Sequence, residues 1–162
     1  MKKICIALVA MFAMTFAAIA DESFAYGFWF DAPKGVGSTE VEGIALGIPV
    51  ISCGNLEGAA LAICGTHAKR VEGVQLVWFG FNYAKSLEGV QLGFVNLQDG
   101  QHGDFSLQLG GYNQSAKNGV QLGFINNAKN NATFQFGFIN INKNGLLPVM
   151  IFVNFGKDFF DK

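Results

Sequence analysis

The side chains that could do acid–base or nucleophilic chemistry in this chain are few and scattered. Its only two histidines are His67 and His102, and both fall in segments whose composition predicts turns. Nucleophilic catalysis needs a serine, cysteine or threonine beside a histidine base, and a third group that orients the base. Neither histidine has such partners at a recognisable spacing. We therefore expect solvated turn histidines, no catalytic residue and a protein that is not an enzyme.

The acidic residues fit a solvated surface better than a metal centre. Asp99, His102 and Asp104 lie close together, but in a Gly-rich turn that no other part of the chain repeats. A metal site needs clustered ligands at a recognisable spacing, so we expect a polar loop here. Most of the glutamates that precede a repeated phrase stand just before its first glycine, which indicates solvated strand ends and not a catalytic acid pair. These glutamates are Glu40, Glu42, Glu57, Glu72 and Glu88. No glycine-rich phrase leads from a strand into a helix as a nucleotide site requires, so the sequence predicts no metal and no cofactor.

Glutamine is the polar residue that the central repeated phrases share. It stands at Gln75, Gln91, Gln108, Gln121 and Gln135. If these amides are buried they must find hydrogen-bond partners. We expect a structural ladder or a network inside a barrel, and the functional alternative is a polar lining for a narrow lumen.

These residues belong to a phrase that recurs along the chain. Its clearest copies are Gly89–Asn96 (GVQLGFVN), Gly119–Asn126 (GVQLGFIN) and Thr133–Asn140 (TFQFGFIN), and Ser106–Asn113 (SLQLGGYN) is a close variant. With weaker copies included, the starts fall at residues 43, 58, 73, 89, 106, 119, 133 and 147. A fixed unit with connectors of variable length predicts an architecture built by repetition.

Within each phrase, large and small side chains alternate. Val90, Leu92 and Phe94 fall on one face, which Glu88 and Asn96 bound. The opposite face holds the small and amide residues, and the segments between phrases are rich in Asn, Gly, Lys, Asp and Ser. A period of two residues is typical of an extended strand, and the connectors have the composition of turns. We therefore expect an all-β fold.

Two arrangements of such strands remain open. One is an antiparallel meander or up-and-down β-barrel of about 8 to 10 strands. The other is a parallel β-solenoid with about 15 residues per coil, in which the asparagines stack as a ladder. A coil of that length must bend, and the alternation looks longer than the short strands that bends allow. For this reason, and because connector length varies, we favour the antiparallel arrangement.

The first twenty residues have the pattern of an export signal. Lys2 and Lys3 precede an uncharged run, and Ala18-Ile19-Ala20 has the form that signal peptidase cleaves. We expect a signal peptide at residues 1–20 and a single β-repeat domain at residues 21–162. The remaining domain would carry 9 basic and 12 acidic residues, a net charge of 9 − 12 = −3, which argues against nucleic acid as a partner. The domain retains Cys53 and Cys64, at different positions of their repeats, and whether they form a disulfide is left open.

Composition and strand length point to an apolar environment. Apolar residues make up 51% of the chain and charged residues only 14%. If the strands close into a barrel, the Val, Leu and Phe face points outward, where it needs lipid or a partner. Strands of 9 to 11 residues are long enough to cross a membrane. We expect the protein to be exported across the inner membrane and to reach the outer membrane or cell surface, with the periplasm as the alternative.

On these motifs, the chain resembles a group of bacterial surface-repeat proteins built from tandem G-(V/L/F)-Q-(L/I/F)-G-(L/F)-(I/V)-N units after a signal peptide. The resemblance runs from about Ser23 to Phe155 and includes the closing Leu147-Pro148 and Asn154-Phe155 pairs. The early units depart from the pattern, with Ala45 and Ala60 in the place of glutamine. The group is described as outer-envelope and uncharacterised, so the resemblance implies a location and no activity.

The sequence therefore predicts a non-enzymatic envelope protein with a structural or interaction role. Its partners would be outer-membrane lipid or another envelope protein, and its oligomeric state is left open. One alternative is a solenoid module that binds a ligand or a host protein through connectors such as residues 98–104. The other is a small pore or lipid-handling barrel that uses the glutamine face.

Overall fold

The structure is a computed structural model that describes residues 23–29, 36–100, 105–116, 119–130 and 132–159. The signal peptide expected at residues 1–20 lies outside the described residues, and so do His102 and Asp104. No helix in these ranges is both long and apolar enough to span a membrane.

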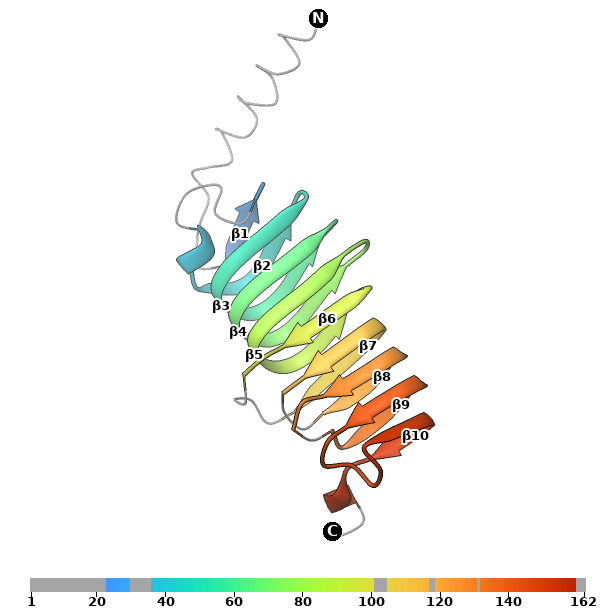
Figure 1. Cartoon of the computed structure of the whole chain (residues 1–162). Helices are drawn as coiled ribbons and strands as arrows, with labels where there is room; N and C mark the ends of the chain where they lie inside the picture. The colour runs from blue at the N-terminus through green and yellow to red at the C-terminus, as the bar shows by residue number, and fades with distance from the viewer. Residues whose placement is uncertain (1–22, 30–35, 101–104, 117–118, 131, 160–162) are drawn as a thin grey trace, which may run out of the picture.

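The described chain is almost entirely β-structure, which confirms the expected fold class (Figure 1). Two short 3₁₀ helices, η1 (Val36–Ser38) and η2 (Lys157–Phe159), lie near its ends. The strands form one ten-stranded sheet in chain order. They are β1 (Phe24–Gly27), β2 (Val41–Gly47), β3 (Val50–Ala62), β4 (Gly65–Val77), β5 (Phe81–Leu92), β6 (Val95–Gln98), β7 (Ser106–Ser115), β8 (Val120–Ala128), β9 (Phe134–Asn142) and β10 (Val149–Phe155).

The strand pairing decides between the two architectures. Every described pair from β1 to β9 is parallel, and only β10 runs antiparallel to β9. Equivalent repeat positions face each other, as Gln91 faces Gln75 and Gln108. The antiparallel meander or barrel that we favoured is therefore wrong, and the chain forms the alternative parallel β-solenoid.

Each coil has two walls joined by two bends. Strand β5 demonstrates this, because residues 81–84 pair with β6 whereas residues 89–92 pair with β7. We call the wall that contains residues 81–84 and their stacked equivalents wall A, and the wall that contains residues 89–92 and theirs wall B. The walls face each other within a coil, since Gln75 Nε2 on wall B donates a hydrogen bond to the Tyr83 carbonyl on wall A at 3.2 Å.

The bend from wall B to wall A explains why the alternation of large and small side chains led to the wrong architecture. Gln91 and Asn96 are both fully buried, although they stand at positions of opposite parity, and Phe94 between them is 71% exposed. The chain turns at Gly93 and Phe94, which shifts the inward-facing positions by one residue. An apparently unbroken strand is therefore two short strands, and Asn96 lies inside the coil and not on the face of Val90 and Leu92.

Glycine at this bend is required by space. A Cβ on Gly123 would overlap the carbonyl oxygen of Gly110 and the side-chain nitrogen of Asn113. Gly110 and Gly137 have the equivalent neighbours in their own coils. The repeated glycine therefore allows each coil to stack on the one before it while a buried asparagine passes alongside.

Candidate interaction surface

One serine–histidine pair forms where the sequence predicted an isolated turn histidine. His67 lies in β4, not in a turn, and its Nδ1 is 3.1 Å from Ser52 Oγ on the coil before. Its ring stacks on Tyr83 of the next coil, with centroids 4.8 Å apart. Burial lowers the pKa of His67, and the charge of Lys69 lowers it further, whereas a hydrogen bond to its own backbone acts in the opposite direction.

This pair does not have the geometry of a nucleophilic site. In a catalytic triad the serine bonds to Nε2 and an acid holds Nδ1, whereas here Nδ1 faces the serine. Ser52 is also buried, at 6% exposed. The arrangement instead aligns Ser52, His67 and Tyr83 as one stacked row of wall A.

The acidic residues do not converge on a point. Within the described residues, no group of three or more His, Cys, Asp and Glu side chains is placed to hold a metal ion. Four glutamates instead stack in register along wall B, one per coil: Glu42, Glu57, Glu72 and Glu88. Of these, Glu72 forms an ion pair with Arg70.

The two cysteines of the domain are both free, Cys53 buried and Cys64 exposed. Burial raises the pKa of Cys53 to about 11.

The glutamines form a buried ladder, which is one of the two structural arrangements expected from the sequence. From Gln91 to Gln135, each amide nitrogen donates to the Oε1 of the glutamine one coil earlier, at distances of 2.7–2.9 Å. Each also donates to a carbonyl on the facing wall, as Gln108 does to Gln114 at 2.9 Å. Both protons of the amide group are used, so this ladder ties successive coils together and also ties the two walls of one coil.

The asparagines form a second ladder that runs the other way. Asn82 donates to Asn96, and Asn96 donates to Asn113, each at 2.8 Å, and the series continues through Asn126 to Asn140. Asparagine amides therefore point toward the C-terminal coil, whereas glutamine amides point toward the N-terminal one. The interior of these coils is filled by the two ladders, so the glutamines line no open lumen there.

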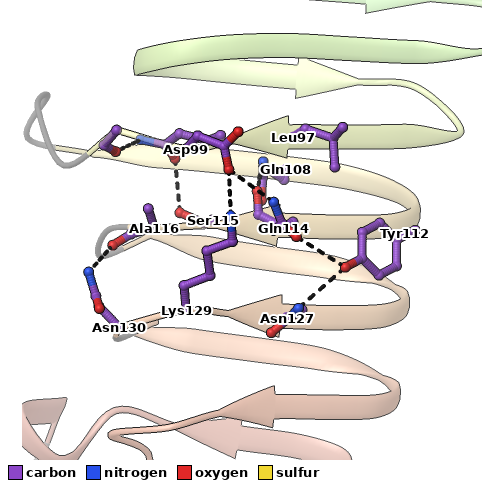
Figure 2. Close-up of polar contacts among 12 residues, drawn as sticks. Leu97, Asp99, Gln108, Tyr112, Gln114, Ser115, Ala116, Asn127, Lys129 and Asn130 are labelled. Atoms are coloured by element: carbon purple, nitrogen blue, oxygen red, sulfur yellow. Dashed lines mark hydrogen bonds and ion pairs between the residues drawn. The ribbon is translucent and has the colours of Figure 1, made fainter.

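A polar network covers the outside of wall A in the C-terminal coils (Figure 2). Asp99 accepts hydrogen bonds from Gln114 at 3.1 Å and from Lys129 at 2.6 Å. Tyr112 donates to Gln114 and accepts from Asn127, each at 3.3 Å. Asp99 belongs to the connector at residues 98–104, where we expected contacts with a ligand or host. These bonds hold Asp99 against neighbouring coils. Residues 101–104 lie outside the described part.

The outside of wall B carries two apolar rows beside the glutamate row. Two outward rows, neither of them buried, run from β1 to β10, and we call them together the apolar face. The first row holds Phe24, Ile44, Ala59, Val74, Val90, Leu107, Val120, Phe134 and Phe155. The second row holds Tyr26, Leu46, Leu61, Leu76, Leu92, Leu109, Leu122, Phe136 and Val153. Soluble proteins rarely expose an apolar patch of this extent unless something binds it.

A second apolar feature follows the bend from wall B to wall A. We call it the bend column, and its side chains are 46–75% exposed. It consists of Ile48, Ile63, Trp78, Phe79, Phe94, Phe124, Phe138 and Phe152. Phe138 stacks on Phe124 with ring centroids 5.2 Å apart and meets Phe152 edge-on at 6.3 Å. The rings fall in two groups, because Gly111 occupies the equivalent position between Phe94 and Phe124. Solvated aromatic rings grouped in this way favour contact with an apolar partner.

The bend column and the apolar face meet in a groove of about 550 Å³. Its lining is carbon-rich throughout: Leu46, Gly47, Ile48, Leu61, Ala62, Ile63, Leu76 and Trp78. The sequence indicated the outward Val and Leu face, but it did not indicate the groove. The groove arises because residues about 15 positions apart stack on one another, and the shared repeat position of Ile48 and Ile63 is the signal that could have found it.

Comparison with family models, with curated proteins and with solved structures finds no match to this chain.

Proposed function

We propose that this protein is a non-enzymatic structural and interaction module of the bacterial cell envelope. In this proposal it is exported by residues 1–20 and resides at the outer membrane or cell surface. The observation that carries the proposal is the bend column, in which Trp78, Phe79 and Phe94 are each more than 70% exposed. Aromatic side chains of this kind are suited to the boundary between lipid and water, because their rings are apolar and rigid.

The chemistry of the rest of the molecule supports a binding role over a catalytic one. His67 faces Ser52 with Nδ1, the nitrogen that bonds to the acid in a catalytic triad. The amide ladders use the donors of their side chains inside the coils, which makes the solenoid a stiff support for surface residues. A stiff support that displays apolar side chains loses less conformational entropy on binding a partner than a flexible one does.

The test is fractionation of cells that express the full chain and a variant with Trp78→Ser, Phe79→Ser and Phe94→Ser. We expect the wild type in the membrane fraction and the triple variant in the soluble periplasmic extract. A matched control carries Leu146→Ser and Leu147→Ser, because these side chains are 58% and 54% exposed but lie outside the bend column. The control should stay with the membrane. A wild-type protein found wholly in the soluble periplasmic extract contradicts the proposal.

The groove favours a second candidate, the handling of a single apolar ligand. A volume of about 550 Å³ lies within the range of small-molecule sites, and Trp78 in its lining provides a signal. Titration with a fatty acid should change Trp78 fluorescence, and Trp78→Phe should remove the change. If the signal does not change, the groove binds no acyl chain.

A further inference from the structure

We propose that the protein rests on a lipid bilayer along one edge, with its long axis parallel to the membrane plane. In this position the bends from wall B to wall A lie among the lipid headgroups, and the bends from wall A to wall B lie in water. The inference rests on the proposed envelope location and deepens it, because it names the partner as a lipid surface and states which side of the molecule meets it. Its test is separate, since vesicles report lipid contact without any other envelope component.

Charged residues are confined to one side of every coil. From the first row of the apolar face, through the bend from wall B to wall A and onto wall A, the chain carries no Asp, Glu, Lys, Arg or His. We call this side the charge-free half, and it comprises residues 44–52, 59–66, 74–83, 90–97, 107–114, 120–127 and 134–141. The other side of each coil carries charges, as Lys85 and Glu88 do around the bend from wall A to wall B. Such a division matches the change in polarity at a bilayer surface.

The apolar surface of the charge-free half continues round a convex edge. On wall B it consists of the two rows of the apolar face, and at the bend it consists of the bend column. On wall A the first outward row after the bend holds Phe81, Val95, Tyr112, Ile125 and Ile139, none of them buried. The flat wall of a second copy would cover only one side of this edge. Lipid can surround the edge from both sides, which favours a bilayer as the partner.

The backbone at this edge is hydrogen-bonded within the protein. The Gly93 amide donates to the Leu109 carbonyl at 3.1 Å, and the Phe94 carbonyl accepts from the Tyr112 amide at 3.0 Å. From the interior, Asn96 Nδ2 donates to the same Leu109 carbonyl at 2.9 Å. Equivalent bonds run from Asn82 to Leu92, from Asn113 to Leu122 and from Asn126 to Phe136. Unpaired backbone groups exclude irregular chain from lipid, so paired groups allow these bends to enter it.

Distance along the walls limits how deep the edge can sink. With the walls upright and about 3.3 Å per residue, the Leu92 row stands about 7 Å above Phe94, the Val90 row about 13 Å and Glu88 about 20 Å. On wall A, Asp99 stands about 16 Å above Phe94 by the same measure. Interfacial segments sink about 5–10 Å into the boundary between headgroups and acyl chains. The bend column and the Leu92 row therefore reach the lipid, and the carboxylates stay in water, where their charge costs nothing.

The orientation of the long axis follows from the two groups of aromatic rings. The coils stack along one axis, so their bends form a single edge along the sheet (Figure 1). Trp78 and Phe79 lie toward its N-terminal end and Phe124 and Phe138 toward its C-terminal end, and all four are more than half exposed. Both groups can enter the lipid at once only if the axis is parallel to the membrane plane.

The first test is flotation of the purified protein with vesicles of phosphatidylcholine, a lipid without net charge, so that charge attraction does not contribute. We expect the wild type to float with the vesicles and Phe94→Ser to bind about fivefold more weakly or less. Phe105→Ser is the matched control, because Phe105 is 52% exposed but stands at the repeat position of Glu88, outside the charge-free half. It should bind as the wild type does. Circular dichroism checks that each variant is folded.

The second test measures position with an environment-sensitive fluorophore on a single thiol. Cys64 is exposed beside Ile63 of the bend column and takes the label directly, whereas Cys53 is buried. In a Cys64→Ser background the same label is attached to Phe138→Cys and, as the matched control, to Lys85→Cys. On addition of vesicles, we expect the emission at Cys64 and at Phe138→Cys to shift to the blue. The emission at Lys85→Cys should not change.

Each contrary result identifies what is wrong. A blue shift at only one of the two bend positions overturns the parallel axis, and a blue shift at Lys85→Cys overturns the half-immersed position. If Phe105→Ser binds as weakly as Phe94→Ser, the charge-free half is not the side that meets lipid. If the wild type does not float although fractionation places it with the membrane, lipid contact is overturned and the envelope location stands. A wild type in the soluble periplasmic extract contradicts the location itself.

Discussion

The N-terminal and C-terminal coils share one backbone path but fill it with opposite chemistry. In the N-terminal coils a buried apolar row runs through Val41, Leu56, Val71 and Leu87. In the same coils, Ala45 and Ala60 occupy the position that glutamine holds later. From β7 onward, buried amides dominate the interior. A parallel coil can therefore be filled by either kind of core, provided that each inward row stacks residues of the same kind.

The two cores differ in how strictly they specify stacking. Apolar side chains gain stability from burial wherever they are covered. An amide ladder gains it only in register, because a slip of one residue leaves buried donors and acceptors unpaired. The amide ladder in the C-terminal coils therefore fixes the register in which coils stack. The apolar row in the N-terminal coils instead stabilises those coils mainly through the hydrophobic effect. The predictions below test this contrast, from the largest expected effect to the smallest.

The tightest point of the amide-filled coils is the glycine at the bend. Gly123→Ala places a Cβ on the Gly110 carbonyl and the Asn113 side chain, so we expect a loss of at least about 3 kcal/mol in the free energy of unfolding, measured in urea. Gly111→Ala is the matched control, because the nearest atom to its Cβ is the Phe94 carbonyl oxygen at 3.2 Å. We expect this variant to lose less than about 1 kcal/mol. Equal stability of the two variants would disprove the steric argument.

Size-conserving substitutions separate the two cores directly. Gln108→Leu leaves Gln91 Oε1 without its donor and Gln121 Nε2 without its acceptor, and we expect a loss of about 3 kcal/mol. Leu56→Met, in the apolar row, should cost less than about 1.5 kcal/mol. Urea unfolding of both variants checks the difference. If Gln108→Leu proves as mild as Leu56→Met, the ladder does not control register.

The end of the glutamine ladder should be less sensitive than its middle. Gln135 Oε1 is buried and has no hydrogen-bond partner within the described residues. Gln135→Leu removes that unpaired oxygen. Within the ladder it leaves only Gln121 Oε1 without a donor, and on the facing wall the Ile141 carbonyl loses its bond from Gln135. We expect a loss of about 1 kcal/mol, smaller than for Gln108→Leu. A larger loss at Gln135 than at Gln108 would show that the ladder is not stabilised link by link.

The smallest effect is a pH dependence in the N-terminal coils. The pKa of His67 is lowered from 6.5 in the folded chain, chiefly by burial. The unfolded chain therefore binds a proton at this site before the folded chain does. The contribution of His67 is complete above about pH 6.5 and is lost as the pH falls through the lowered pKa. Lys69, Ser52 and Tyr83 are the groups beside it.

The measurement is thermal stability between pH 7 and pH 5, for the wild type and for His67→Gln. We expect the wild type to lose more stability than the variant as the pH falls. Identical slopes would mean that His67 is equally solvated in both states. Tyr112→Phe, which changes a row on the same wall in the C-terminal coils, should leave the slope unchanged.

The strand content and the inward position of the glutamines followed from local pattern. Residues that alternate in size along an extended chain predict an all-β fold. Glutamines among small neighbours, such as Gln91, predict a ladder or a network if they are buried. The structure confirms both. The signal peptide, the location in the envelope and the absence of catalysis stay predictions, because they depend on residues or events outside the described coils.

The amino-acid sequence by itself determined that this chain is built from a repeated strand unit, because side-chain period and repeat spacing are local properties. Only the tertiary structure decided that the strands stack in parallel. The deciding residues are Gly93 and Phe94, where a bend shifts the inward positions by one and sends Asn96 into the interior. The alternation of large and small residues continues through this bend, so the pattern alone predicts one long strand. Only the pairing with the next coil reveals the bend. The contact between Ser52 and His67 and the continuity of the apolar face have the same origin, since stacking alone brings residues about 15 positions apart together.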